Sequence, residues 1–286
     1  MRIIPIVENT VAADGLLAKH GLCLYIETRD HKMLMDLGPN DTFIYNAATL
    51  GIDLTEIDMV VLSHGHADHV GGLKAFLSIN DKAKIYLHRN TCDPHFLKVS
   101  GFPCPMGIDN SVIDAYPDRF VFTDHFTKVD GEITLFAGVT GRRCFAKSND
   151  MYYVRKESKL VKDNFSHEQN MLLTNGKEWA LVAGCAHNGI LNILERAVEV
   201  CQEKPKTVLS GFHLYNEPTD EYESDALVKE LGEGLLEWTD TEFYTYHCTG
   251  AKSFEKLKEM MGERLHYFAT GQSIELLEEI EGYILY

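Results

Sequence analysis

Val60 to Gly72 read VVLSHGHADHVGG, an apolar run that leads into a histidine-rich loop and a pair of glycines. The run is typical of a buried strand, and the glycines indicate a turn into the helical pattern that follows. Four side chains of the loop are good metal ligands: His64, His66, Asp68 and His69. The first two suit one cation, whereas the last two suit a second ion nearby. A solvated polar loop is the alternative, but three of the 13 histidines lie here, spaced for chelation.

Further ligands are available where other β-rich runs end. The runs that begin at Met33, Trp179, Thr207 and Phe243 stop at residues that can bind a metal: Asp36, Cys185, His187, His213, His247 and Cys248. Sites in open α/β sheets collect at the carboxyl ends of strands, so we expect several of these side chains to meet at one sheet edge. His247 suits a metal ligand, a proton donor or a phosphate contact, with an ordinary packed histidine as the alternative. We interpret Cys248 as buried rather than reactive.

Composition excludes several classes of protein. The 286 residues are 45% hydrophobic and 24% charged, which is typical of a globular chain and excludes disordered and collagen-like sequences. The net charge of -16 gives no electrostatic reason to bind nucleic acid or an anionic membrane, so we expect a small-molecule substrate. No apolar stretch approaches the roughly 20 residues of a membrane span, and Met1–Glu8 lacks signal-peptide features, which predicts a cytoplasmic protein. Seven cysteines without a CxxC pair argue against a disulfide framework.

The chain alternates β-rich runs with helical patterns, which indicates a layered α/β fold. An apolar stripe over 190–201 predicts a helix packed on a sheet, and a similar stripe predicts another helix opening near Gly250. The stretch from Thr91 to about Phe165 breaks this rhythm with proline, glycine and cysteine. We expect residues 1–286 to form one domain in which 91–165 is an insertion or lid over the metal edge.

The histidine cluster after an apolar strand resembles the defining motif of the metallo-β-lactamase superfamily. A closer likeness is to the metal-dependent hydrolases often labelled dihydropterin-methyl-aminobenzene ribofuranosyl-phosphate synthase. The matching segments are Met35–Gly38, Asn46–Ala47, Leu50–Ile52, Leu62–His66, Gly184–Ile190, Gly211–Leu214 and His247–Gly250. The resemblance implies an αββα sandwich, two β-sheets between helices, with a dinuclear metal site along the sheet edge.

The resemblance also implies roles for individual residues. It assigns His64 and His66 to the first metal, Asp68 and His69 to the second, and His213 as the histidine that closes the second site. Gly184-Cys185 stands where the superfamily usually has a metal-bridging aspartate. A thiolate at Cys185 suits zinc; if the thiol only packs, His187 binds instead.

His167 lies about twenty residues before that pair, where the superfamily usually has its remaining histidine, and so competes with His187 for the first site. We favour His187, which lies in a glycine-flanked turn suited to carrying a ligand. Because a thiolate bridges less predictably than a carboxylate, we expect the two ions to be held unequally, or only one to be held. The remaining histidines, at positions 20, 31, 88, 95, 125 and 266, are expected to have no ligand role.

Three functions fit these residues. The first is a hydrolase of an ester or phosphate-type substrate, in which Asp68 and His247 are the candidate catalytic residues. The second is a transferase that condenses a dihydropterin pyrophosphate with an aminobenzene ribofuranosyl phosphate. The third is a non-hydrolytic di-iron or redox protein, but iron relatives commonly replace the second histidine of the cluster with glutamate, and His66 is present. We therefore expect zinc, one ion or two, with iron or manganese as alternatives.

An anionic or pterin-like substrate needs recognition by charge or by stacking. Arg142, Arg143 and Lys147 are candidates for contacts to an anionic tail, although paired basic residues are more often solvated. Aromatic rings for stacking are available at Phe102, Tyr152, Tyr153 and Phe212.

Overall fold

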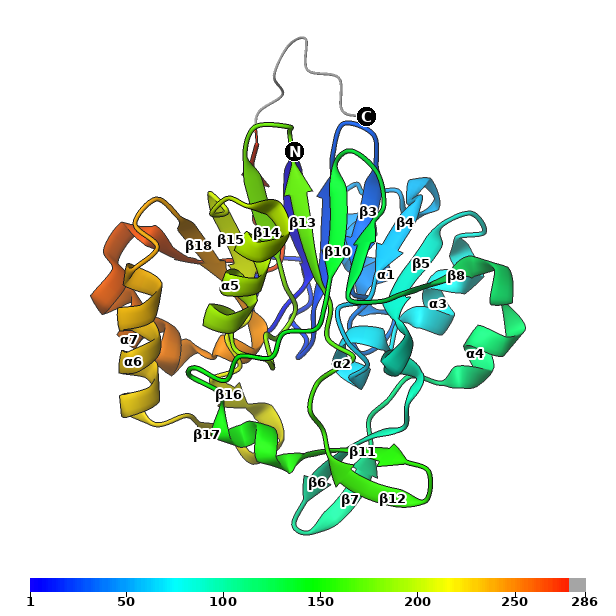
Figure 1. Cartoon of the computed structure of the whole chain (residues 1–286). Helices are drawn as coiled ribbons and strands as arrows, with labels where there is room; N and C mark the ends of the chain where they lie inside the picture. The colour runs from blue at the N-terminus through cyan, green and yellow to red at the C-terminus, as the bar shows by residue number, and fades with distance from the viewer. Residues whose placement is uncertain (278–286) are drawn as a thin grey trace.

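Two seven-stranded β-sheets lie face to face, and helices cover the outer face of each (Figure 1). The structure is a computed structural model in which residues 1–277 are described. The first sheet has the order β20 (Ile274–Glu275), β1 (Arg2–Val7), β2 (Cys23–Glu27), β3 (Lys32–Met35), β4 (Met59–Val61), β5 (Lys84–His88) and β8 (Phe120–Thr123). The second has the order β19 (Leu265–Tyr267), β18 (Glu242–Thr245), β15 (Thr207–Ser210), β14 (Trp179–Val182), β13 (Asn170–Thr174), β10 (Ile133–Phe136) and β9 (Phe126–Lys128).

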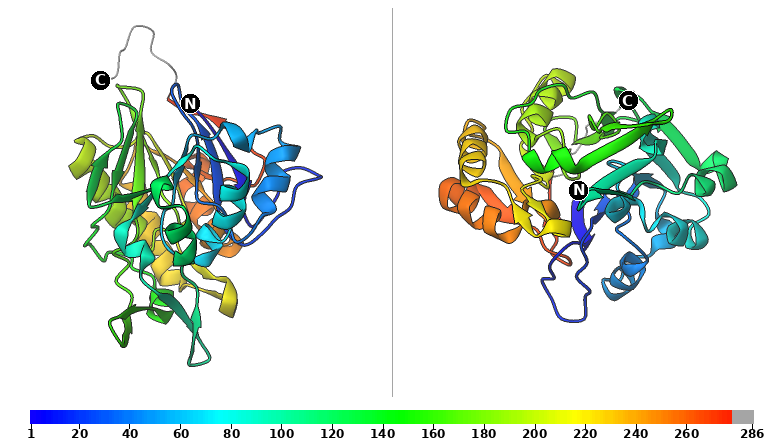
Figure 2. Two further views of the ribbon diagram at one scale, coloured as in Figure 1. Left: turned by 90° about the vertical axis from the view of Figure 1, so that its right-hand side faces the viewer. Right: turned by 90° about the horizontal axis from the view of Figure 1, so that it is seen from below.

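The helices divide between the two outer faces, which confirms the expected αββα sandwich. The first sheet is covered by α1 (Thr42–Thr49), α2 (Ala67–Val70), α3 (Leu73–Ile79) and α4 (Asn110–Ala115). The second is covered by α5 (Ile190–Cys201), α6 (Asp225–Leu236) and α7 (Ala251–Met261), as the two views of Figure 2 also show. The helices predicted over 190–201 and from Gly250 are confirmed as α5 and α7. None of the helices in residues 1–277 has the length and apolarity that crossing a membrane requires.

Alternating side chains explain why the strands form two sheets with three apolar layers. In β4, Met59 and Val61 point into the layer between the sheets, whereas Val60 points toward the helices of the first sheet. In β14, Ala180 and Val182 face the same central layer, whereas Leu181 packs under the helices of the second sheet. Strands buried on both faces read as continuous apolar runs, and these runs are the strand signals in the sequence.

The strands that precede the candidate ligands are parallel. β3, β4, β5 and β8 are parallel neighbours in the first sheet. β14, β15, β18 and β19 are parallel neighbours in the second. Within each sheet the carboxyl ends of these strands therefore share one edge, where functional loops collect.

The stretch 91–165 contributes strands to both main sheets and to a smaller third sheet. β8 joins the first sheet, and β9 and β10 join the second. A smaller four-stranded sheet consists of β12 (Lys159–Lys162), β11 (Tyr152–Lys156), β6 (His95–Val99) and β7 (Phe102–Pro105). It lies below the sandwich in Figure 1, at the end where α2 lies. The irregular composition around short strands hid the runs that belong to the main sheets.

The remaining elements are short. β16 (Tyr215–Asn216) and β17 (Glu221–Tyr222) form a two-stranded hairpin between β15 and α6. Short 3₁₀ helices are η1 (Leu54–Glu56), η2 (Arg89–Cys92), η3 (Pro117–Arg119), η4 (Lys147–Met151), η5 (Glu217–Thr219), η6 (His247–Thr249) and η7 (Gly262–Arg264). The hairpin, η4 and η6 border the candidate site.

Candidate metal centre

The histidine-rich loop leaves β4 and enters α2, and a buried aspartate fixes its geometry. Asp36, which follows β3 with a left-handed φ of 61°, accepts a hydrogen bond from the Ser63 backbone N–H at 2.7 Å. Its Oδ2 also lies 2.7 Å from Ser63 Oγ and 2.6 Å from His69 Nδ1. Ser63 Oγ in turn lies 2.8 Å from His64 Nδ1. The rings of His64 and His69 therefore each have a hydrogen-bond partner at Nδ1 and present Nε2 to the centre. This arrangement is typical of metal-binding histidines.

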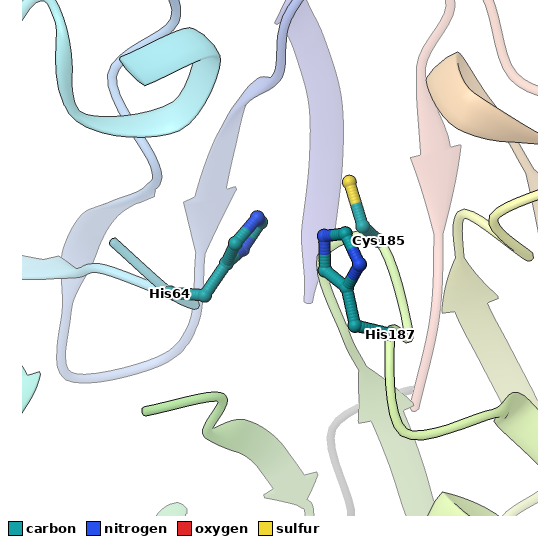
Figure 3. A group of neighbouring side chains, drawn as sticks. All are labelled: His64, Cys185 and His187. Carbon is teal, nitrogen blue, oxygen red and sulfur yellow. The ribbon is translucent and has the colours of Figure 1, made fainter. Parts of the chain in front are cut away.

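Three histidines form a first ligand group: His64, His66 and His187. Their ring centroids are 4.5 to 4.9 Å apart, and all three rings are buried. Within the described chain, the Nε2 atom of each has no hydrogen-bond partner. A buried polar atom without a partner costs about 1–3 kcal/mol, so three such atoms converging on one place fit a bound cation. Cys185 joins this group, and Figure 3 shows His64 facing Cys185 and His187 across the space between their loops.

His187 is held in place by contacts to its backbone, to its Nδ1 atom and to the face of its ring. Its backbone N–H donates to the buried Glu168 carboxylate at 2.6 Å, and its Nδ1 lies 3.0 Å from Asn149 Oδ1. Its ring stacks on Phe165 at 4.6 Å. The preceding residue, Ala186, has a φ of 55°, a backbone state that residues other than glycine seldom adopt.

His167, the competing candidate, is only partly engaged elsewhere. Its Nδ1 accepts a hydrogen bond from the Gly65 N–H at 3.0 Å, whereas its Nε2 lies 3.3 Å from Asp163 and has no hydrogen-bond partner in the described chain. His95 lies 2.8 Å from the same carboxylate. The ligand atom of His187, however, lies within 4.8 Å of those of His64 and Cys185. His167 therefore supports the loop between His64 and His66, and the geometry favours His187 as the ligand.

A second ligand group consists of Asp68, His69 and His247. His247 Nε2 lies 3.1 Å from Asp68 Oδ2 and 3.3 Å from His69 Nε2. His247 follows β18 with a φ of 51°, and its Nδ1 lies 2.9 Å from Asn9 Oδ1. The structure therefore places His247 beside Asp68 and His69, the two residues with which the sequence grouped His213.

His213 lies in a third arrangement. It is 3% exposed, and in the described chain neither of its ring nitrogens has a hydrogen-bond partner. Its ligand atom lies within 4.8 Å of those of Cys185 and Cys248. Its ring centroid is 4.1 Å from that of His187. His213 thus belongs to the same centre, but with sulfur neighbours instead of Asp68 and His69.

Cys185 connects the three arrangements. It is buried, and its Sγ lies 3.1 Å from His69 Nε2. It is also grouped with His64 and His187, and with His213 and Cys248. A side chain in this position can bridge ions, as the sequence proposed for the residue after Gly184.

His20 is a contributor that the sequence analysis missed. It lies in the connection between β1 and β2, and its Nε2 is 3.7 Å from Asp68 Oδ2. Its ring centroid is 4.5 Å from that of His247. Burial, with the neighbouring His247, lowers the pKa of His20 to about 4. No apolar run precedes His20, so the sequence carried no signal for it.

The electrostatics of the centre differ between the histidines of the first ligand group and His69. Burial lowers the pKa of His64, His66 and His187 well below its usual value. For His69 burial acts in the same direction, but Asp68 and Asp36 outweigh it and raise the pKa to about 10. Burial raises the pKa of the Cys185 thiol. A cation binding here would displace the protons of His69 and of any thiol that ligates.

A small pocket opens onto both ligand groups. Its walls include His66, Asp68, His187, His213, His247, Tyr152 of β11, and Tyr215 and Asn216 of β16. Its volume of about 20 Å³ admits about one water molecule. Tyr152 stacks on His66 with ring centroids 4.9 Å apart, so the small four-stranded sheet forms one wall. The strands of this sheet belong to the stretch 91–165, for which a role as a lid stays a prediction.

Most residues proposed for substrate recognition lie away from this pocket. Arg143 pairs at 2.8 Å with Glu237, the residue that follows α6, and is exposed. Arg142 donates to the Gly141 carbonyl at 2.7 Å and approaches Asn188 Oδ1 at 3.3 Å, so it supports the turn after His187. Neither arginine lines the small pocket.

Most of the aromatic rings proposed for substrate stacking also lie away from this pocket. Phe102 is 75% exposed on β7, and Phe212 is buried among the helices of the second sheet. Tyr153 contacts Lys98 and Lys162 instead. Only Tyr152, of the four proposed rings, lines the pocket. Lys147 lines a wider cavity of about 440 Å³ with Ser148, Asp150, Met151 and Glu221–Glu223.

Comparison with known proteins supports the geometry. The family model described as "Metallo-beta-lactamase superfamily" matches residues 18–129, a range that contains the histidine-rich loop. An uncharacterized protein of Methanocaldococcus jannaschii is 28% identical over 260 residues, covering 89% of this chain and 93% of its own. The 7,8-dihydropterin-6-methyl-4-(β-D-ribofuranosyl)-aminobenzene-5'-phosphate synthase of the same organism is 27% identical over 267 residues, covering 87% and 88%.

A solved structure gives the same result for the fold. A crystal structure described as a metal-dependent hydrolase of the beta-lactamase superfamily superposes with a TM-score of 0.81 and 25% identity. The match covers 97% of this chain and 100% of that one. The similarity therefore includes both sheets as well as the matched range.

Proposed function

Because this chain carries a metallo-β-lactamase superfamily domain, we propose that it is a metal-dependent hydrolase of an ester or phosphate-type small molecule. One observation carries the proposal. The unpartnered Nε2 atoms of His64, His66 and His187 converge beside the second ligand group, and Cys185 lies between the two. A structural histidine normally bonds through both ring nitrogens, so this convergence favours a metal centre over a packed core.

The donor set favours zinc. Imidazole nitrogen, carboxylate oxygen and thiolate sulfur are its common ligands, whereas manganese prefers oxygen. Iron remains the alternative that the imidazoles also fit. When bound, such ions would lower the pKa of a water molecule toward neutrality and polarise the oxygen of the substrate.

The protein side chains would then orient the reactants. The Asp68 side chain is 23% exposed at the pocket and lies 3.1 Å from His247 Nε2. This carboxylate is placed to hold a water molecule and accept its proton, and His247 is placed to bind a metal or pass that proton on. Tyr152 and residues 215–218 form further walls of this pocket.

The substrate must enter from the pocket mouth, because the pocket itself admits little more than water. The wider cavity lies beside it: Asn216 lines the small pocket, and its Nδ2 contacts Sδ of Met151, which lines the wider one, at 3.2 Å. We propose that this cavity receives the non-reacting part of the substrate. Its acidic lining means that attraction of an anionic group depends on the bound metals.

The alternative function is a dihydropterin pyrophosphate-dependent transferase. It is favoured by the relative of that name, which aligns over 87% of this chain. Tyr152 is the available ring against which a pterin could stack. The two functions differ in their products, because a transferase releases pyrophosphate only when the aminobenzene acceptor is present.

The test combines metal analysis with product analysis. Chelator-stripped protein would be reloaded with zinc, iron(II) or manganese(II) and assayed with phosphodiesters, lactones, and the pterin pyrophosphate with and without its acceptor. We expect up to two ions per chain and hydrolysis without any acceptor. Less than about half a metal equivalent would overturn the proposal, whereas acceptor-dependent pyrophosphate release would favour the transferase.

A matched pair of variants identifies the site. His64→Ala with His66→Ala should reduce metal content and bring turnover to background, because it removes two of the three ligands of the first group. His125→Ala is the control, since His125 is exposed and lies outside the ligand groups. Unchanged metal content in the double variant would contradict the assignment.

A further inference from the structure

We infer that Cys185, His213 and Cys248 form a thiolate-rich metal subsite, here called the thiolate group, built by the second sheet alone. The inference shares Cys185 with the proposed hydrolytic centre but does not depend on the reaction. It assigns a ligand role to Cys248, which the sequence analysis interpreted as a buried side chain. The ligand class is a soft divalent cation such as zinc or cadmium.

The topology of the second sheet places these residues together. β14, β15 and β18 are adjacent parallel strands that end at Val182, Ser210 and Thr245. Each of the three ligand residues comes three positions beyond one of these ends. The strands are nearly level, because Val182 pairs with Leu209 and Ser210 pairs with Thr245. Because each ligand residue lies three positions beyond the end of its strand, and the three strand ends lie side by side, the three side chains converge.

The contacts among the three residues are close and buried. Their ligand atoms all lie within 4.8 Å of one another. The His213 backbone N–H donates to Cys248 Sγ at 3.3 Å, and the Cys248 thiol donates to the Cys185 carbonyl at 3.5 Å. Gly211 leaves room for this approach, because a Cβ there would lie 2.5 Å from Cys248 Sγ.

His213 supplies the observation that points to a ligand. Both of its ring nitrogens are buried and without a hydrogen-bond partner in the described chain. Its φ of 48° is in the left-handed region, which residues other than glycine seldom occupy. Such backbone states persist where the surroundings require a particular side-chain direction. Here that direction brings the ring beside two sulfur atoms.

The donor chemistry defines what would bind. Zinc–sulfur bonds of about 2.3 Å and zinc–nitrogen bonds of about 2.0–2.1 Å, in tetrahedral geometry, separate neighbouring ligand atoms by about 3.5–3.8 Å. The group therefore needs only a small contraction to coordinate an ion. All three residues line the small pocket, so a fourth position faces solvent or substrate. Each thiol that ligates loses its proton to water as the metal–sulfur bond forms.

Cadmium is the probe, because a thiolate bound to Cd²⁺ absorbs in the near ultraviolet. Reduced, metal-free protein would be titrated with Cd²⁺ alone. We expect Cys248→Ser to lose about half of the saturating absorbance and to bind Cd²⁺ at least tenfold more weakly. Cys201→Ser is the matched control, because Cys201 lies on α5 outside the ligand groups. Full absorbance in Cys248→Ser would overturn the inference.

Two further measurements keep the inference independent of folding and of the proposed reaction. X-ray absorption of the Cd²⁺-loaded wild-type protein should report two sulfur neighbours for one bound ion, and one or none would overturn the inference without any variant. His64→Ala with His69→Ala removes ligands of the first and second groups. This variant should lose hydrolysis yet keep the thiolate absorbance of one Cd²⁺, and loss of that absorbance would count against a separate subsite.

Discussion

At the scale of single residues, Asp36 orients two rings of the candidate centre without lining its pocket. One buried carboxylate contacts His69 directly and His64 through Ser63. It therefore fixes the direction of one ring in each of the two ligand groups. The sequence indicated Asp36 only as a strand end, because its contacts depend on the neighbouring strand β4.

We expect Asp36→Asn to weaken metal binding by about 10- to 100-fold, the usual effect of losing the partner of a metal-binding histidine. The asparagine amide keeps the shape of the carboxylate, but only one of its two terminal atoms can accept hydrogen bonds. Chelator competition would measure the affinity. Asp53→Asn, at the start of η1 on the surface, should leave it unchanged. Equal affinity in Asp36→Asn and wild type would show that the rings are held by packing alone.

Cys185 gives a second prediction at this scale. Cys185→Asp should raise occupancy of the weaker site, because a carboxylate bridges two ions more reliably than a thiolate. Cys185→Ser should lower total metal content, measured by elemental analysis. If Cys185→Ser binds the same metal with the same affinity from pH 6 to 8, the thiol is a packing residue.

At the scale of elements, the small four-stranded sheet is the part of the expected insertion that reaches the centre. β11 brings Tyr152 over His66, while His95 at the start of β6 contacts Asp163, which His167 also contacts. The same sheet therefore covers the pocket and supports the loop between two ligands.

We expect Tyr152→Ala to accelerate metal release to a chelator several-fold, because it opens one wall of the pocket and removes the ring that stacks on His66. Tyr152→Phe keeps the ring and should release metal at the wild-type rate. The rates would be measured by stopped-flow dilution of zinc-loaded protein into chelator. Identical rates for the alanine and wild-type proteins would mean that Tyr152 does not control access.

The sequence could predict features that depend on residues close together in the chain, but not those that depend on the order of strands or on distant segments. Histidine spacing after an apolar strand is local, and it predicted the ligand-type residues from His64 to His69, whose side chains the structure brings close together. The choice between His213 and His247 depended on the order of strands and on left-handed backbone at both residues, which no local pattern specifies. His20 comes from an irregular connection, so its place beside Asp68 was visible only in three dimensions.

At the scale of the whole molecule, contacts at the opposite end from the centre join the two sheets. His31, in the turn between β2 and β3, lies 2.9 Å from Asp58 and 2.7 Å from Asp130 of the second sheet. Thr28 Oγ1 donates to the buried Glu132 at 2.7 Å in the same region. Partial burial lowers the pKa of His31, but hydrogen bonds and charge from Asp58 and Asp130 outweigh it and raise the pKa.

This contact predicts a pH dependence of stability. A raised pKa means that protonated His31 stabilises the folded state below about pH 6.5, the value in the unfolded chain. That stabilisation is lost as pH rises through the higher pKa of the folded state. The difference in unfolding free energy between wild type and His31→Gln, measured in urea, should shrink from pH 6 to pH 9. A difference in unfolding free energy that stays constant from pH 6 to pH 9 would contradict the assignment.

The position of Glu8 has a consequence for when the candidate metal centre can form during synthesis. Its carboxylate accepts from the His247 backbone N–H at 2.8 Å and from the Tyr267 hydroxyl at 2.6 Å. The N-terminal strand thus supports a ligand that leaves the ribosome 239 positions later. A nascent chain that ends before β18 has the histidine-rich loop but neither His247 nor Cys248. Complete candidate ligand groups would therefore require a chain that has been synthesised beyond Cys248, and a translation product interrupted earlier would lack His247 and Cys248.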